Sequence, residues 1–306
     1  MAAISIGDAI GEGFALIRRR PLAVLAWGAV RMVFTAGVFS LMAPVYLSLF
    51  SQLAERAKSG ITTPPDVASM MQLQGASWLL SLIGGFMAMV LYCAVFRAVL
   101  HPEQSRFAYL RVGAAELFMA VLAIVFYIAM FIVLFIIFIP VAIVIAISAA
   151  AHAPVVGAIL VVVAVIAAVV ALFWLIFRLC LAGPMIVQDG KFHLFDAWSL
   201  TRGHAGTLFL IALCVAVILL VLEAVVGAVA LALGLGLLGQ AAGGLRNLPT
   251  FFSQPPATIL SSMAPALVIA ALASIPISGA AMAIIGAPWA RAYRDLAQPD
   301  LAATFS

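Results

Sequence analysis

Residues 198–202 read WSLTR, and an apolar run long enough to cross a lipid bilayer begins a few residues later. The same pattern, an aromatic residue, a small residue, two further residues and an arginine, recurs at residues 14–18 (FALIR) and 107–111 (FAYLR). We call these three stretches the opening motifs, because each stands just before a long apolar run. Their repetition predicts three related units that each begin at a membrane surface.

The balance of residue types places the chain in lipid. Hydrophobic residues make up 67% of its 306 residues and charged residues only 8%, whereas soluble domains carry roughly 25% charged residues. Few polar segments are long enough to form a separate soluble domain, so we expect one transmembrane domain over residues 1–306. The formal net charge of +4 comes from basic residues at the ends of apolar runs, so no nucleic-acid partner is expected.

Six apolar runs predict an all-α polytopic membrane helical bundle with six transmembrane helices. The predicted spans are residues 22–50, 77–96, 116–147, 155–177, 207 to between 231 and 238, and 264–289. The first and third are longer than the roughly 20 residues that a bilayer requires. We therefore expect them to tilt or to bend, at Pro44 and Pro140 respectively.

Two less apolar segments, residues 4–19 and 192–202, are predicted as amphipathic helices that lie on the cytoplasmic membrane surface. The first carries an apolar stripe at helical spacing, made of Ile6, Ile10, Phe14 and Ile17.

The second, fourth and sixth spans close on a matching pair of residues. These closing pairs are Phe96-Arg97, Phe177-Arg178 and Tyr293-Arg294, and each is followed by a proline five or six residues after the arginine. Together with the opening motifs they predict three two-helix repeats, at about residues 4–102, 106–184 and 192–299. The alternative is that aromatic residues and arginines gather at any membrane interface.

The distribution of lysine and arginine predicts the orientation. With the N-terminus inside, eleven basic residues face the cytoplasm and three face outward. The inner set is Arg18, Arg19, Arg20, Arg97, Arg106, Arg111, Arg178, Lys191, Arg202, Arg291 and Arg294, and the outer set is Arg56, Lys58 and Arg246. Because basic loops stay in the cytoplasm, both termini are expected there.

Two charged residues lie deep in apolar runs. At 1.5 Å per residue, Arg31 lies about 15 Å into the first span and Glu223 about 24 Å into the fifth. Charges at such depths are costly, so they indicate pairing or function. One interpretation is that they form an ion pair with each other, or that Arg31 reaches the interface while Glu223 stays protonated. The other is a polar site on a transport path.

A second group of candidates lies at the cytoplasmic face, where guanidinium groups can bind lipid phosphates. It consists of Arg18, Arg97, Arg111, Arg178, Arg202, Arg294 and Trp198. Glu116 is expected among the headgroups, beside Arg111. A row of small residues on the fifth span, Ala228, Ala232 and Gly236, predicts close helix packing.

The sequence contains no nucleophile elbow, phosphate-binding loop, paired carboxylates or metal-ligand spacing. We therefore expect no enzymatic activity, no cofactor and no metal. The leading hypothesis is a non-enzymatic membrane component that organises lipids or partner proteins. The alternatives are a small transporter, channel or lipid-handling permease, and an accessory subunit of a larger membrane complex. Membrane lipids are the expected partners, with a membrane protein or a second copy of the chain as further candidates.

The segment around the third opening motif, residues 195–202 (FDAWSLTR), resembles a known bacterial family, and residues 7–20 are similar in style. That family is the six-span membrane domain found fused to some glycerophosphodiester phosphodiesterases, together with its stand-alone relatives. The resemblance implies a multi-pass protein of the bacterial inner membrane. It does not imply phosphodiesterase activity, because that activity belongs to a soluble domain with no counterpart in this sequence.

Overall fold

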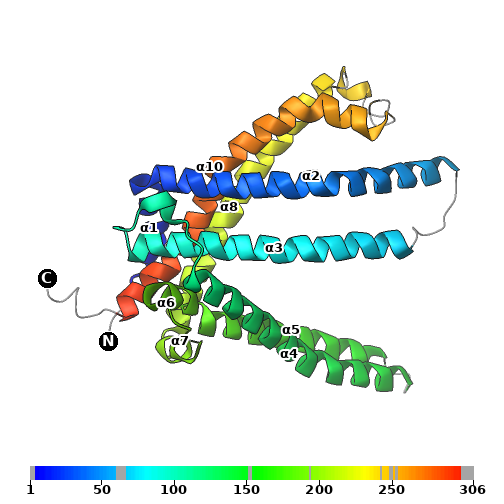
Figure 1. Ribbon diagram of the computed structural model, residues 1–306. Helices are drawn as coiled ribbons and strands as arrows, with labels where there is room; N and C mark the ends of the chain where they lie inside the picture. The colour runs from blue at the N-terminus through cyan, green and yellow to red at the C-terminus, as the bar shows by residue number, and fades with distance from the viewer. Residues whose placement is uncertain are drawn as a thin grey trace. The chain divides into compact units, whose positions relative to one another are not determined.

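A computed structural model describes residues 4–59, 67–150, 154–192, 194–241, 243–247, 251 and 254–297. All regular secondary structure in these ranges is helical, which confirms the all-α prediction. The helices are α1 (Ile6–Arg19), α2 (Pro21–Ser59), α3 (Val67–Leu100), α4 (Ala114–Ala150), α5 (Pro154–Leu179), α6 (Ala182–Asp189), α7 (Leu194–Leu200), α8 (Ala205–Ala241) and α10 (Pro256–Ala297). Two single turns, η1 (Arg106–Tyr109) and η2 (Leu245–Asn247), complete the described elements (Figure 1).

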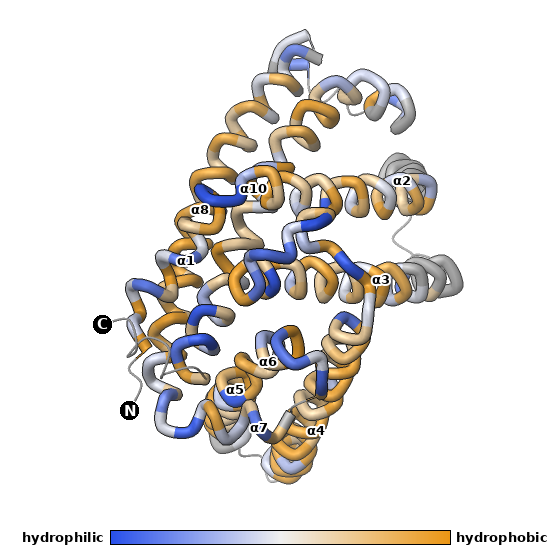
Figure 2. Tube along the Cα trace, turned by 60° about the vertical axis from the view of Figure 1, so that its left-hand side comes forward, coloured by the Kyte–Doolittle hydropathy of each residue, from blue (hydrophilic) through white to orange (hydrophobic). Residues whose placement is uncertain are grey.

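Within the described ranges, six helices are long and apolar enough to cross a membrane, as predicted. Their apolar segments are Pro21–Val45, Ser77–Leu100, Arg106–Ser148, Gly157–Asp189, Ala205–Leu237 and Ser261–Ala297. Each predicted span falls inside one of the long helices. Figure 2 shows hydrophobic residues along these helices and hydrophilic residues concentrated at helix ends and in the short connecting segments. These features indicate a multi-pass membrane protein.

The prolines inside the spans do not end their helices. Pro44 lies within α2, which is 39 residues long, and Pro140 lies within α4, which is 37 residues long. Transmembrane helices tolerate proline because neighbouring groups satisfy the freed backbone carbonyl. The apolar segment of α2 ends at Val45, so the extra length of that helix comes from its more polar C-terminal part.

Residue contacts divide the chain into two compact units, each built from separate stretches of sequence. Unit 1 comprises Met1–Phe14, Tyr92–Leu213 and Ile285–Ser306, and unit 2 comprises Ala15–Leu91 and Cys214–Ile284. Several long helices therefore contribute one part to each unit. The limits of the units do not follow the limits of the three predicted repeats.

In unit 1, the apolar helices α4 and α5 lie side by side, with α6 and α7 packed against them (Figure 1). The interior of α6 is buried from Ala182 to Val187. The helix ends at Gly190, which adopts a left-handed conformation with φ 65° and donates its N–H to the carbonyl of Ile186 at 2.9 Å. This is a common way to satisfy the last turn of a helix. The outward side chains of α4 and α5 are large, apolar and exposed, as expected for a surface that faces lipid.

In unit 2, α2 and α10 touch through their backbones. A Cβ atom on Gly28 would collide with the carbonyl oxygen of Ile275, and one on Gly279 would collide with the carbonyl oxygen of Val24. Both positions therefore require glycine, because any side chain there would overlap the backbone of the other helix. Small residues at such contacts allow membrane helices to approach closely.

The row of small residues predicted to pack closely is not part of the crossing between α2 and α10. Ala228, Ala232 and Gly236 on α8 are exposed, and Gly236 has no neighbouring atom near the position of a Cβ. The expectation that this row packs closely within the chain is therefore wrong. Four-residue spacing is common along apolar helices, and only the tertiary arrangement decides which small residues form a contact.

Helix α1 matches the first predicted amphipathic segment in extent, but a different face is buried. Ala9, Gly13 and Leu16 are buried, whereas Phe14 of the predicted apolar stripe is 49% exposed. The other three residues of the predicted stripe, Ile6, Ile10 and Ile17, are half-buried, so only Phe14 points fully outward.

Candidate functional site

An ion pair between described residues of unit 1 joins α3 to α4. Nη2 of Arg97 lies 2.5 Å from Oε1 of Glu116, and the Glu116 side chain is fully buried. The other carboxylate oxygen of Glu116 accepts the backbone N–H of Gly113 at 2.9 Å, which caps the start of α4. Glu116 was expected beside Arg111, and this expectation is wrong; its expected depth at the level of the headgroups stays a prediction. Arg97 is nearer because the chain between α3 and α4 folds back on itself.

The turn that brings Arg97 and Glu116 together has an unusual backbone. Phe107, Ala108 and Tyr109 in η1 have φ angles of 52°, 54° and 64°. Such values are costly for residues other than glycine, so the surroundings must hold them. Tyr109 supplies two of the restraints: its hydroxyl donates to the carbonyl of Pro102 at 3.0 Å, and its own carbonyl accepts Nη1 of Arg97 at 3.3 Å. The second opening motif is thus a left-handed turn, unlike the first, which lies in α1.

A second cluster surrounds Arg178 at the end of α5. The guanidinium carbon lies 5.7 Å from the ring centre of Trp174 and 5.3 Å from that of Trp198, within the range of cation–π attraction. Nη1 donates to the carbonyl of Trp198 at 3.4 Å, and Nε is buried without a hydrogen-bond partner among the described residues. The Thr201 hydroxyl donates to the carbonyl of Arg178 at 3.4 Å and to that of Trp198 at 3.2 Å. The two tryptophan rings and the Trp198 carbonyl therefore hold this guanidinium.

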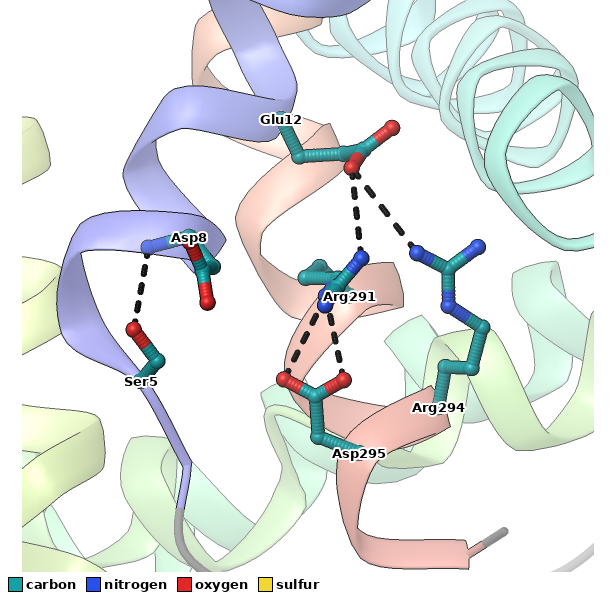
Figure 3. Close-up of polar contacts among 6 residues, drawn as sticks. All are labelled: Ser5, Asp8, Glu12, Arg291, Arg294 and Asp295. Carbon is teal, nitrogen blue, oxygen red and sulfur yellow. Dashed lines mark hydrogen bonds and ion pairs between the residues drawn. The ribbon is translucent and has the colours of Figure 1, made fainter. Parts of the chain in front are cut away.

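A third cluster joins α1 to the C-terminal part of α10 (Figure 3). Oε2 of Glu12 lies 3.7 Å from Nη1 of Arg291 and 3.8 Å from Nη2 of Arg294. Nε of Arg291 also lies 3.0 Å from Oδ1 of Asp295, one turn further along the same helix. Two arginines and two carboxylates balance each other, so the cluster acts as an ionic clasp between α1 and α10.

The part of α2 that carries Arg31 faces a cleft against α10, within unit 2. The cleft has a volume of about 630 Å³. Its lining from α2 is Arg31, Met32, Thr35, Ala36, Phe39 and Ser40, and from α10 it is Ala264, Leu267, Val268, Ala271, Ser274 and Ser278. Phe39 and Val268 are 53% and 58% exposed, so the cleft opens to the surroundings of the protein. A hollow with this lining is suited to hydrocarbon.

Glu223 does not belong to this cleft. It is exposed on α8 and is absent from the described lining, and no ion pair joins it to Arg31 in the part of the chain that the structure covers. The interpretation of these two residues as an ion pair is therefore not supported. Their depths along the helices differ by roughly 9 Å, which already argued against a direct contact.

The arginines that were predicted at the cytoplasmic face have different environments. Arg18 and Arg202 are exposed, and Arg111 is exposed with Nη1 donating to Oε1 of Gln104 at 3.1 Å. Arg97 is buried, and Arg294 is partly buried in the ionic clasp. The group predicted as one set therefore divides into arginines with internal partners and arginines that point outward.

Sequence reasoning missed several residues that the structure brings together. Arg291 and Asp295 are four residues apart on one helix, a spacing that predicts an ion pair in hindsight. Gly28 and Gly279 carried no local signal, because single glycines are frequent in membrane helices. The pairing of Glu116 with Arg97 depends on the left-handed turn at residues 107–109, and the sequence of the second opening motif does not predict that conformation.

The described residues contain no group of three or more His, Cys, Asp or Glu side chains that could hold a metal ion. Comparisons of the chain with protein-family models, curated proteins and solved structures find no significant match. The resemblance to the six-span membrane domain therefore stays a hypothesis. The clusters described above can hold helices together, and the cleft can accept an apolar ligand.

Proposed function

We propose that the chain is a non-enzymatic component of a bacterial inner membrane that binds and organises lipids. The observation that carries this proposal is the cleft between α2 and α10, which is lined mainly by apolar side chains and opens outward. Acyl chains are the apolar molecules that surround such a surface in a bilayer. The charged residues outside the cleft that have close partners serve structural contacts: Arg97, Glu116, Glu12, Arg291, Arg294 and Asp295.

In this proposal the three two-helix repeats are related by an axis along the membrane normal, with both termini in the cytoplasm. The contacts of the closing arginines support the repeats. Each contacts the region that opens the next repeat, and the last contacts the first: Arg97 with Tyr109, Arg178 with Trp198, and Arg294 with Glu12. The exposed Phe14 side chain of α1 then lies against lipid, together with the outward arginines Arg18 and Arg202.

The alternatives have less support. A small transporter or channel needs a polar path that joins Arg31 and Glu223, and Glu223 is not part of the described cleft lining. An accessory subunit needs a protein partner on the exposed apolar faces of α4 and α5, and lipid covers such faces equally well.

Extraction of the membrane into polymer-bounded discs, followed by affinity purification and exchange into mild detergent, tests the proposal. We expect phospholipid to remain bound after the detergent wash, without a stoichiometric second protein. Empty detergent micelles taken through the same wash provide the background. A stoichiometric partner protein with no retained lipid would contradict the proposal and favour an accessory subunit.

A further inference from the structure

The guanidinium of Arg178 lies in an aromatic corner at the end of α5, where α7 packs against that helix (Figure 1). The rings of Trp174 and Trp198 are nearly perpendicular, at 86°, with their centres 4.8 Å apart, and the guanidinium lies against both. Its one hydrogen bond to a described residue, from Nη1 to the Trp198 carbonyl, is long at 3.4 Å. The rings therefore fix the position of the cation and leave most of its N–H donors without an acceptor in the described part of the chain.

The depth of Arg178 along α5 matches the edge of the hydrocarbon. The apolar segment of this helix begins at Gly157, and Arg178 lies about 32 Å further along at 1.5 Å per residue. The hydrocarbon core is roughly 30 Å thick, so a helix that crosses it places Arg178 at the level of the headgroups. Tryptophan rings are enriched at this level, as Trp174 and Trp198 are here. A lipid phosphate can therefore reach this guanidinium without entering the hydrocarbon.

The closing arginines differ in how the protein balances their charge. Arg97 pairs with Glu116, and Arg294 lies 3.8 Å from Glu12. No ion pair joins Arg178 to a carboxylate within the ranges that the structure describes. Of the three equivalent positions, the one at the end of α5 thus keeps its positive charge for a group outside the described chain.

A second cation begins beside the same helix end. The Thr201 hydroxyl donates to the carbonyl of Arg178 at 3.4 Å, and Arg202 is the next residue. The Arg202 side chain is exposed, and it forms no ion pair with any described residue. Two uncompensated cations near one membrane surface favour a lipid whose headgroup has a net negative charge.

An exposed apolar stripe runs along α5 from this corner. Its members are Trp174, Val170, Ile166 and Val163, which are spaced by three or four residues and therefore share one face of the helix. The stripe is about 16 Å long at 1.5 Å per residue. That length is close to half of the roughly 30 Å hydrocarbon core, which is the depth of one leaflet. An acyl chain along the stripe would have its headgroup at the end where Arg178 lies.

We infer that the corner formed by Arg178, Trp174 and Trp198 binds the headgroup of an anionic phospholipid, with Arg202 as a second cation. Guanidinium groups form strong, often paired hydrogen bonds with phosphate oxygens. One acyl chain of the lipid lies on the exposed stripe of α5. The inference rests on the proposed lipid-binding function and adds to it a headgroup site and the class of lipid.

The test uses the full-length protein in detergent, titrated with phosphatidylglycerol or phosphatidylcholine and followed by native mass spectrometry. The ratio of the two affinities is measured, because a general loss of structure would weaken both lipids alike. We expect the wild type to prefer phosphatidylglycerol. Arg178→Gln should reduce the ratio by about fivefold, which corresponds to the roughly 1 kcal/mol that a basic residue contributes at an anionic membrane surface.

A second variant keeps the inference testable if Arg178→Gln fails to fold. Arg202→Gln should reduce the ratio in the same direction, and its exposed side chain is not needed for packing. Arg246→Gln serves as the matched control, because this exposed arginine is predicted at the opposite membrane surface and should leave the ratio unchanged. Millimolar inorganic phosphate should not displace the lipid, since a free anion gains nothing from the apolar stripe.

An unchanged ratio in both Arg178→Gln and Arg202→Gln would overturn the inference, as would a wild type that binds the two lipids equally. Displacement of phosphatidylglycerol by inorganic phosphate would identify a site for soluble anions and overturn it as well. In each of these cases the phospholipid retained by the wild type leaves the proposed function standing. Failure of the wild type to retain any phospholipid would overturn both.

Discussion

Nη2 of Arg97 lies 2.5 Å from Oε1 of a fully buried Glu116, and this pair ties the end of α3 to the start of α4. The carbonyl of Tyr109 accepts a hydrogen bond from Nη1 of the same guanidinium, which restrains the left-handed turn between the two helices. One arginine thus neutralises a buried carboxylate and supports a strained connection.

Removal of the Glu116 charge is expected to destabilise the protein strongly. Breaking a buried ion pair at one partner leaves the other charge uncompensated, at a typical cost of about 3–5 kcal/mol. Glu116→Gln should therefore lower the midpoint of thermal unfolding in detergent well below that of the wild type. The control is Glu103→Gln, because the Glu103 side chain is 65% exposed. Similar midpoints for the two variants would contradict the assignment of Glu116 as a structural residue.

The crossing of α2 and α10 should not tolerate a side chain at Gly28. An added methyl group would meet the carbonyl oxygen of Ile275, and overpacking of this kind typically costs about 1–3 kcal/mol. We expect Gly28→Ala to lower the unfolding midpoint and to reduce cross-linking between cysteines placed on the two helices. Gly37→Ala, on the same helix with open space around it, should be neutral or slightly stabilising. Equal behaviour of the two variants would argue against a backbone contact at this crossing.

The ionic clasp between α1 and α10 should depend on salt. Glu12 lies 3.7 and 3.8 Å from two guanidinium groups that are partly exposed, so each pair contributes only about 0–1 kcal/mol. Glu12→Gln should increase hydrogen exchange in α1, and 1 M salt should have a similar effect on the wild type. Asp8→Asn on the same helix serves as the control, because Asp8 is exposed. If hydrogen exchange in α1 were as slow in Glu12→Gln as in the wild type, apolar packing alone would account for the attachment of α1 to α10.

The two tryptophan rings around Arg178 predict a preference for a planar cation. Arg178→Lys should destabilise the protein by about 1 kcal/mol and change tryptophan fluorescence, because an ammonium group cannot stack on two rings as a guanidinium does. Arg202→Gln, an exposed arginine in the turn after α7, should leave both the fluorescence and the unfolding midpoint unchanged. If Arg178→Lys matched the wild type in both the unfolding midpoint and tryptophan fluorescence, the cation–π interpretation would be contradicted.

The excess of basic residues on one side predicts that both termini face the cytoplasm. Green fluorescent protein fused to either terminus should fluoresce, and alkaline phosphatase fused to the same positions should be inactive. A phosphatase fusion in the predicted outer loop, residues 51–76, should be active and serves as the control. Phosphatase activity at either terminus would contradict the predicted orientation.

The long helices could be predicted because their signal is local. A run of roughly 20 apolar residues is sufficient to indicate a membrane span, whatever it packs against. All six spans were therefore found, and only their ends differ from the prediction. The length of α2 was the least predictable, because the helix continues beyond its apolar segment.

The contacts between helices could not be predicted in the same way. Arg97 finds Glu116 only because Phe107, Ala108 and Tyr109 adopt a left-handed turn, and nothing in their side chains favours that conformation. Gly28 and Gly279 lie far apart in the sequence, so their contact depends on the tertiary fold. Arg31 was recognised from its depth alone, and its apolar cleft became visible only in the structure.

The most direct measurement is an experimental density map of the protein in a disc of phosphatidylglycerol. Our account predicts elongated acyl-chain density in the cleft between α2 and α10. A cleft that is closed by protein side chains, or one that is open but contains no ordered lipid, would contradict it.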